Sequence, residues 1–221
     1  MNIKRITALC LAALLLLLCP FAPAEEEGDL LMLVGPEDPV PDGWVPRELV
    51  RLEEVIPEGF CTYEHEGILA VPEAAEAWVR LLEAAHADGL TEWCFSEGYR
   101  SVEEQRQLLD DTVSRFMSER GLSGERALEA ALITVALPGC SEHHTGLAFD
   151  ITVPGEYFGD TAQYLWMLTH AAEYGFILRY PEEKEDLTGY ELEEWHFRYV
   201  GTEHAMKISA QGLCLEEYLA E

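Results

Sequence analysis

The sequence predicts an α+β fold: a single compact domain in which a small, mostly antiparallel sheet is flanked by helices. At 221 residues the chain suits one substantial domain and is too short for two large ones. Helical and strand-like segments also follow one another without the regular spacing of βαβ units, which argues against a doubly wound parallel sheet. The helices and strands are therefore expected to share one core.

The first 24 residues have the organisation of a secretory signal peptide. Two basic residues precede an apolar run, and small residues close it. An uncleaved membrane anchor is the alternative, although the run is shorter than the roughly 20 residues that a spanning helix prefers. We therefore expect a signal peptide or N-terminal anchor over 1–24, a solvated spacer over 25–29 and an exported domain over 30–221, in the cell envelope or outside it.

The formal net charge of −28 at pH 7 limits the range of partners. A strongly acidic surface repels anionic polymers, so nucleic acid is not expected to bind. Most of this charge is interpreted as solvated surface, and it does not identify a substrate.

Four cysteines follow the leader segment. Their even number in an exported protein favours disulfides, for which three connectivities are possible. Metal binding is the rival interpretation and has less support, because no two of them form a C-x-x-C pair. The four are Cys61, Cys94, Cys140 and Cys214.

The first half of the domain predicts two helices separated by a short strand. After a brief apolar strand in LLMLVG, residues 72–88 have one apolar helical face, with Pro in the first turn. A strand is expected over 92–96. A second helix over 101–119 starts at Ser101, with Glu104 at the capping-box position. The apolar face of the first helix consists of Ala75, Trp78, Val79, Leu82 and Ala85.

The second half predicts strands that carry polar residues on one face. Residues 147–153 alternate, so that Asp150 faces away from an apolar set. A helix over 161–174 and a strand over 176–179 follow. Residues 195–200 alternate again and place His196 opposite three aromatic side chains. A closing helix and a tail complete the chain.

A histidine pair and these two polar strand faces are candidates for a metal site. Catalytic zinc takes three protein ligands and leaves one position open. A loop that leads into a strand can bring His143 or His144 to the same ion as Asp150, and His196 is the natural third ligand. The remaining histidines are expected to be ordinary surface or packing residues: His65, His86, His170 and His204.

Three charged residues can complete a hydrolytic site. A carboxylate beside a metal-activated water accepts its proton and passes it to a leaving amine, and Glu193 and Glu194 both stand just before His196. Membership of the acidic loop is the alternative for both. Arg100, in a turn after a strand, can bind a substrate carboxylate with two hydrogen bonds, although an arginine there is usually a surface ion-pair partner.

Several separated blocks together resemble the VanY-type zinc D-alanyl-D-alanine carboxypeptidases, with the related L,D-carboxypeptidases and D,D-dipeptidases. GYRS at 98–101 is similar to the family's S-G-Y-R-S, and SEHHTGLAFD at 141–150 to S-x-H-x-x-G-x-A-x-D. EEWHFRYVG at 193–201 is similar to E-x-W-H-F-R-Y-V-G. The resemblance covers roughly residues 30 to 219.

The resemblance implies a role for each matching position. It places one zinc ion per chain on His143, Asp150 and His196, and the catalytic base on Glu193. Arg100 matches the arginine that binds and orients substrate, and Ser141 matches a pocket serine. The departures from the family pattern are Glu97 in place of a serine and Glu194 in place of a frequent proline.

The implied activity is zinc-dependent removal of the terminal D-alanine from peptidoglycan stem peptides. An L,D-carboxypeptidase that acts on tetrapeptide stems is the alternative, and a non-catalytic wall-binding module is a further one. Contact with the membrane is expected only through an uncleaved anchor. Cys94 and Cys140 flank the arginine turn and the zinc loop, so a disulfide between them is a hypothesis. The oligomeric state is not indicated.

Overall fold

The computed structural model describes residues 30–221. The expected signal peptide or anchor over 1–24 and the spacer over 25–29 lie outside the described residues. Within 30–221, no helix combines the length and the apolar character needed to cross a membrane.

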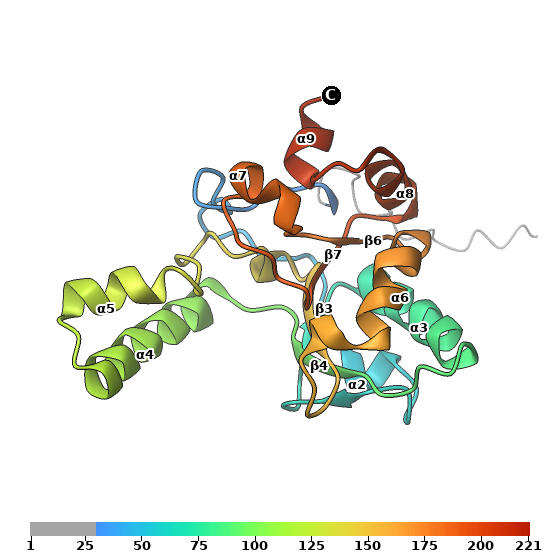
Figure 1. Ribbon diagram of the computed structural model, residues 1–221, viewed down its shortest axis with the longest axis horizontal. Helices are drawn as coiled ribbons and strands as arrows, with labels where there is room; N and C mark the ends of the chain where they lie inside the picture. Colours follow the sequence, from blue (N-terminus) through green and yellow to red (C-terminus); the bar gives the residue numbers. More distant parts are fainter. Residues whose placement is uncertain (1–29) are drawn as a thin grey trace, which may run out of the picture.

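A five-stranded sheet forms the centre of the fold, in the order β2-β4-β5-β7-β6 (Figure 1). Only β2 and β4 run parallel, and every other pair is antiparallel. A separate antiparallel pair joins β1 (Val50–Arg51) to β3 (Leu69–Ala70). The predicted fold class is therefore confirmed. The strands of the main sheet are β2 (Thr62–Tyr63), β4 (Cys94–Glu97), β5 (Ala148–Thr152), β6 (Phe176–Leu178) and β7 (His196–Tyr199).

One face of this sheet packs on helix α3 (Pro72–Ala87). The ring of Trp78 is fully buried and meets Phe95 edge-on, with centroids 5.0 Å apart. It also lies 4.4 Å from the ring of Phe176. Trp78 therefore joins β4 and β6 into one core, and such an aromatic core side chain typically contributes about 3–5 kcal/mol relative to alanine.

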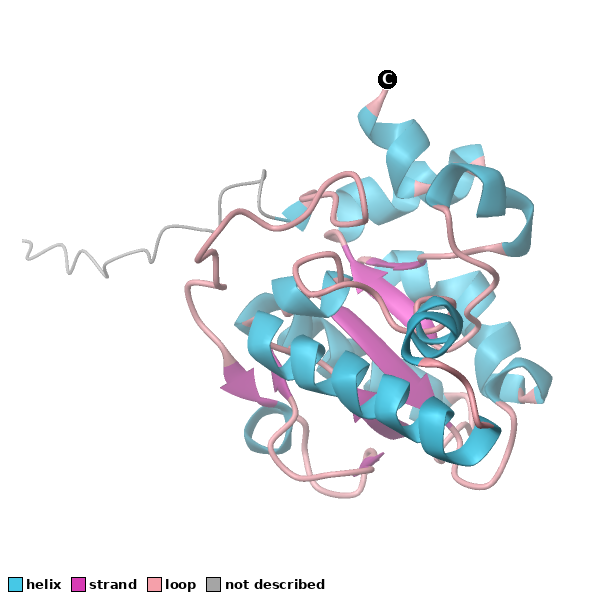
Figure 2. Ribbon diagram, turned by 90° about the vertical axis from the view of Figure 1, so that its left-hand side faces the viewer, coloured by secondary structure: helices cyan, strands magenta, loops and turns pink. Residues whose placement is uncertain are grey.

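Further helices cover the edges of the sheet (Figure 2). The predicted helix over 161–174 is divided into α6 and the 3₁₀ helix η3, and Gly175 follows in the left-handed conformation with φ 94°. The C-terminal helices gather at the β6 end of the sheet (top of Figure 1). The helices are α2 (Leu52–Val55), α6 (Ala162–His170), η3 (Ala171–Tyr174), η2 (Phe158–Asp160), η4 (Glu182–Lys184), α7 (Glu185–Thr188), α8 (Thr202–Gln211) and α9 (Leu215–Leu219).

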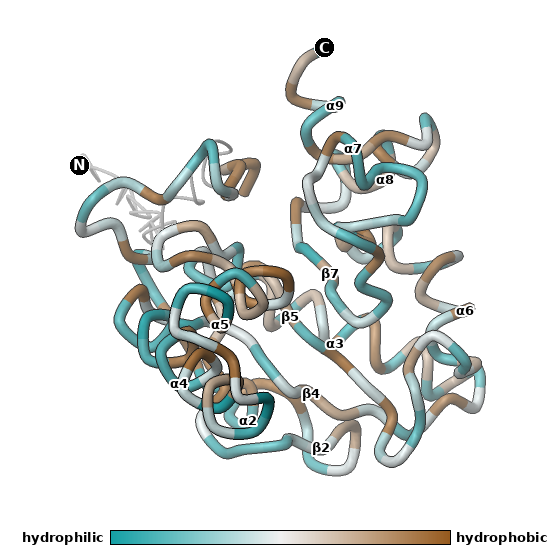
Figure 3. Tube along the Cα trace, turned by 60° about the vertical axis from the view of Figure 1, so that its left-hand side comes forward, coloured by the Kyte–Doolittle hydropathy of each residue, from teal (hydrophilic) through white to brown (hydrophobic). Residues whose placement is uncertain are grey.

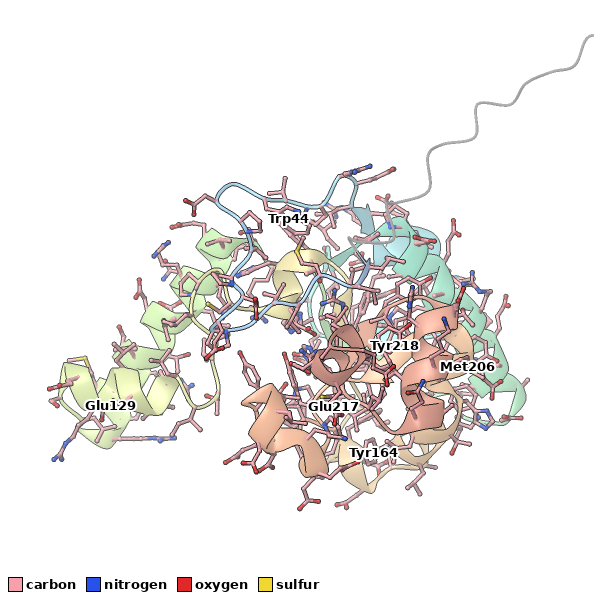
Figure 4. All side chains as sticks on the ribbon, turned by 90° about the horizontal axis from the view of Figure 1, so that it is seen from above. Trp44, Glu129, Tyr164, Met206, Glu217 and Tyr218 are labelled. Carbon is pink, nitrogen blue, oxygen red and sulfur yellow. The ribbon has the colours of Figure 1, made fainter. Side chains whose placement is uncertain are left out.

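A helical hairpin of α4 (Val102–Arg120) and α5 (Gly124–Ala131) projects from the body of the domain (left of Figure 1). The capping box predicted at its start is present, because the Ser101 hydroxyl accepts from the Glu104 N–H and the Glu104 carboxylate accepts from the Ser101 N–H. The hydropathy colouring shows that α4 is largely hydrophilic (Figure 3). Glu129 of α5 lies on the projecting hairpin, well away from Glu217 and Tyr218 of α9 (Figure 4).

The apolar segment after residue 30 does not form the predicted strand. Its backbone has no partner strand, and the carbonyl groups of Leu30 and Met32 instead accept hydrogen bonds from Arg198 Nη2, each at 3.1 Å. A side chain distant in the sequence thus satisfies the polar groups that a neighbouring strand would otherwise bind.

The hypothesis of a disulfide between Cys94 and Cys140 is wrong. Both are free thiols, as are Cys61 and Cys214. Cys94 begins β4 and stands opposite Thr152, whereas the zinc loop packs beyond the other end of that strand, at Gly98. A strand rises about 3.3 Å per residue, so the four residues from Cys94 to Gly98 separate the thiol from this loop by about 13 Å of chain.

Candidate metal centre

Three elements bring the predicted ligands together. His143 lies in the 3₁₀ helix η1 (Glu142–Thr145), Asp150 lies in β5, and His196 starts β7 as the direct register partner of Asp150. Gly146 ends η1 at φ 66°, and a Cβ there would lie 3.0 Å from the Leu49 side chain. This glycine allows the chain to turn from η1 into β5 and so places His143 above Asp150.

Ligand atoms of these three residues converge. One donor atom from each of His143, Asp150 and His196 lies within 4.8 Å of the others. His143 Nε2 is 3.4 Å from Asp150 Oδ2, and His196 Nδ1 is 2.8 Å from Asp150 Oδ1. Ligands about 2.0–2.2 Å from a tetrahedral zinc are roughly 3.3 Å apart, so this spacing suits the ion.

The proton of His143 is directed away from this group. Its Nδ1 lies 2.8 Å from the carbonyl oxygen of Gly98, which can only accept, so Nδ1 donates and Nε2 keeps a lone pair facing Asp150. A Cβ on Gly98 would come within 2.5 Å of the Leu69 carbonyl oxygen, so only glycine fits where this acceptor is presented. A backbone partner on the outer nitrogen is typical of metal-binding histidines.

His144 has both ring nitrogens occupied by backbone groups. The Gly139 N–H donates to Nε2 at 3.1 Å, and Nδ1 donates to the Arg100 carbonyl oxygen at 2.6 Å. Burial lowers the pKa of His144, which favours this neutral form. No lone pair remains for a metal, so the structure separates the adjacent histidines into a candidate ligand and a link between two loops.

The charges around the centre favour a cation. Burial lowers the pKa of His196, but a hydrogen bond to the Asp150 carboxylate and the nearby charge of Glu142 outweigh it and raise the pKa to about 10. Burial likewise opposes ionisation of Asp150, but the two histidines hold its pKa well below the usual range. Two imidazoles, one carboxylate and this negative surrounding form a donor set that fits zinc.

The two candidate bases point to different places. Glu193 lines the cleft beside the metal ligands, with Oε2 3.8 Å from His196 Nδ1 and 26% of its side chain exposed. Burial raises the pKa of Glu193, and the charge of Asp150 adds to this. Glu194 is turned away, and its carboxylate accepts a 2.5 Å hydrogen bond from the Tyr157 hydroxyl, an interaction that raises the pKa of Tyr157 to about 12. Of the two candidate bases, therefore, Glu193 is the one that faces the candidate ligands.

Arg100 lines the same cleft. It donates to Glu97 Oε2 from Nε at 3.0 Å and to Gln105 Oε1 from Nη1 at 2.8 Å. The residue that departs from the family pattern, Glu97, is thus the partner of the candidate substrate-binding arginine. Ser141 is buried and also lines the cleft.

The cleft has two sides of different character. We call the side formed by η1, β5 and β7 the cleft floor, because it carries the candidate ligands. The cleft wall consists of Leu108 of α4 and residues 134–136, which are mostly apolar. Gln105 joins the two sides, because its amide donates to the Ala136 carbonyl oxygen at 2.8 Å while it accepts from Arg100.

Sequence reasoning missed a buried ionic group beneath His196. The carboxylate of Glu142 accepts from Arg179 Nε at 2.7 Å and lies 3.2 Å from Arg198 Nη1. Burial would raise the pKa of Glu142, but these arginines hold it well below the usual range. The signal available in the sequence was the pair of arginines, one directly after the apolar strand 176–178 and one between Phe197 and Tyr199, since a buried charge requires a partner.

Aromatic side chains complete the floor. The ring of Tyr180 lies 5.0 Å from that of His196, and Tyr190 packs against Tyr180. Neither was singled out from sequence. The histidines expected to be ordinary lie outside the ligand group: His65, His86, His170 and His204.

Comparisons with known proteins place this geometry in context. The family model described as VanY, D-alanyl-D-alanine carboxypeptidase, matches residues 68–202. A D-alanyl-D-alanine carboxypeptidase of Enterococcus faecalis (strain ATCC 700802 / V583) is 38% identical over 202 residues, which are 90% of this chain and 70% of that protein.

Solved structures are similar over most of the chain. A mutant of the vancomycin resistance D,D-pentapeptidase VanY from a VanB-type cassette, in complex with Zn(II), aligns with a TM-score of 0.71 and 36% identity, covering 86% of this chain and 99% of that one. The LD-carboxypeptidase LdcB aligns with a TM-score of 0.70 and 39% identity, covering 85% and 84%.

Proposed function

The chain belongs to the VanY family of D-alanyl-D-alanine carboxypeptidases, and on this premise we propose that it is a zinc enzyme that removes the terminal D-alanine from peptidoglycan stem peptides. The observation that carries the proposal is the convergence of His143, Asp150 and His196 beside Glu193. A structural zinc site has no need of a carboxylate next to an open position, which argues against a non-catalytic wall-binding module.

His143 Nε2, an Asp150 oxygen and His196 Nδ1 would hold one zinc ion per chain. When bound, zinc supplies a Lewis acid that polarises the scissile carbonyl and makes water more acidic. Glu193 accepts the proton of the attacking water and transfers it to the amine of D-alanine as the C–N bond breaks. Its raised pKa suits both steps, because a base that later acts as an acid works best near the operating pH.

Arg100 is assigned to the substrate carboxylate. Its guanidinium has donors that match a carboxylate with two hydrogen bonds. In the structure Glu97 Oε2 accepts two of these hydrogen bonds, from Nε and Nη2. Substrate binding therefore requires Arg100 to share or exchange this partner, and Glu97 keeps the group in place before substrate arrives.

The site of action follows from the substrate. Peptidoglycan lies outside the cytoplasmic membrane, so we propose that the domain is exported, with residues 1–24 as a cleaved signal or an anchor. The acidic surface is consistent with a peptide substrate and disfavours anionic polymers.

An L,D-carboxypeptidase is the second candidate, because LdcB is as similar in structure as the D,D-pentapeptidase. Purified protein is incubated with pentapeptide and with tetrapeptide muropeptides, and the products are weighed by mass spectrometry. We expect the pentapeptide to lose a single alanine and the tetrapeptide to persist. Loss of alanine from the tetrapeptide alone would establish the L,D activity instead, and no loss from either would refute both.

A further inference from the structure

Glu142 lies directly behind the candidate ligand His196, in the buried ionic group described above. Its side chain has no exposed surface, although it is a carboxylate. Burying a charge is costly unless the charge is paired and hydrogen-bonded, so such a residue needs a strong reason to be where it is. Neither the catalytic steps nor substrate binding makes use of it.

The two carboxylate oxygens of Glu142 have different partners. Oε1 accepts from Arg179 Nε at 2.7 Å and lies 3.2 Å from Arg198 Nη1. Oε2 faces His196 Nε2 at 3.5 Å. Within the described residues, Oε2 and His196 Nε2 are both buried polar atoms with no closer partner than each other.

The arginines are themselves held in place from opposite ends of the chain. Arg179 donates two hydrogen bonds to Glu216 of α9, at 2.9 Å and 2.7 Å. Arg198 donates to the carbonyl groups of Leu30 and Met32. Glu142 therefore cannot rotate without breaking an ionic group that is fixed on both sides.

This arrangement keeps an N–H on Nε2 of His196. A neutral imidazole has one N–H, and a metal ligand must keep the other nitrogen free. An ionised carboxylate only accepts, so Glu142 Oε2 favours an N–H on Nε2, just as Asp150 Oδ1 favours an N–H on Nδ1 while no metal is bound. A metal would take the place of the Nδ1 proton, whereas the N–H on Nε2 stays with Glu142. Nδ1 is the nitrogen that faces Asp150 and Glu193.

We propose that Glu142 is a positioning residue that fixes the tautomer and ring orientation of His196, so that Nδ1 is presented to the metal. The proposal rests on the zinc site described above. Outer partners of this kind typically change metal affinity 10- to 100-fold when removed.

The test compares E142Q with E216Q. In E142Q the arginines will take the amide oxygen, so the amide NH₂ will face His196 Nε2, oppose an N–H there and leave the ring proton on Nδ1 alone. E216Q disturbs the same ionic group through Arg179 but has no contact with His196, and it is the matched control. Zinc affinity is measured by competition with a chromophoric chelator, and protonation of the two His196 ring nitrogens by NMR of ¹⁵N-histidine-labelled protein without zinc.

We expect E142Q to bind zinc roughly 10- to 100-fold more weakly and, without zinc, to lose the proton on His196 Nε2, with zinc affinity in E216Q within about threefold of the unsubstituted protein. Wild-type zinc affinity in E142Q, with the proton still on His196 Nε2, would overturn the proposal. Equal losses in both variants would also overturn it, because the role of Glu142 would then be structural only.

A second variant keeps the test decisive if E142Q does not fold. E142D keeps a negative charge for the arginines, but its shorter side chain moves the carboxylate away from His196. We therefore expect E142D to fold and still to bind zinc more weakly than the unsubstituted protein. Full zinc affinity in E142D would refute the proposal. An unsubstituted protein that binds no zinc would instead refute the proposed zinc function, so the two failures are distinguishable.

Discussion

The floor and the wall of the cleft are built in opposite ways. On the floor, His143, His144 and His196 are buried, and each ring nitrogen faces a defined partner. The wall belongs to the projecting α4–α5 hairpin and the segment that follows α5. This region has a small core of its own and leaves apolar side chains such as Leu108 half-exposed.

Because of this difference, we expect the floor to carry out the chemistry and the wall to contribute to substrate binding. A floor residue that moves leaves a buried polar group unpaired, which costs far more than a lost contact at the surface. A wall residue contributes apolar contact area with few fixed partners. We therefore expect floor substitutions to act on metal binding and kcat, and wall substitutions to act on KM.

The largest expected effect comes from comparing the adjacent floor histidines. H143A removes a proposed ligand and should weaken zinc binding by more than the roughly 100-fold that outer partners contribute. H144A removes only links to Gly139 and Arg100, so its zinc affinity should stay within about tenfold. Chelator competition measures both, and the reverse order would mean that the ligand was assigned to the wrong histidine.

The next effect concerns the neighbouring glutamates. E193Q removes the proposed base and should reduce kcat about 10²- to 10⁴-fold while zinc remains bound. E194Q is the control, because its amide oxygen can still accept from Tyr157. Steady-state kinetics measure kcat in both variants, and metal analysis measures their bound zinc. Near-normal turnover in E193Q would show that Glu193 is not the base.

A smaller effect is expected on the wall. Leu108 is 37% exposed and lines the cleft, whereas Leu128 is 40% exposed on the same hairpin and is not part of the wall. L108A should raise KM roughly three- to tenfold, since apolar contacts in a binding pocket are worth about 1 kcal/mol or more each. Equal KM values for L108A and L128A would show that the wall does not contact substrate.

The smallest effect is expected where the floor meets the loop around Tyr157. Y157F removes the donor to Glu194 and leaves the turn that carries Glu193 less constrained. Because a misplacement of 1 Å costs about 100-fold, a smaller shift should lower kcat about two- to fivefold with KM unchanged. Y164F, which alters a nearby ring packed on Phe158, is the control and should match the unsubstituted enzyme.

The parts of the floor that follow the strand period could be predicted from sequence. The alternation around Asp150 and His196 placed both on polar faces, and the structure pairs them in register. One face of each strand is buried in a common core, so a shift by one residue would expose the apolar set, and the pattern therefore specifies the register.

Features that depend on distant partners could not be predicted. The role of His144 depends on Gly139 and on Arg100, which is 44 positions away along the chain. Glu142 is one of 42 acidic residues, and nothing local distinguishes it from those on the surface. The apolar residues after residue 30 predicted a strand. The hydrogen bonds from Arg198 to the backbone of this segment leave no trace in its own sequence.

Stepwise zinc reconstitution of the enzyme, with release of D-alanine from a pentapeptide stem measured at each step, tests the central claim most directly. We predict that chelation abolishes hydrolysis and that activity returns in proportion to bound zinc, reaching its maximum at one ion per chain. Full activity in protein shown by metal analysis to contain no zinc would contradict the account.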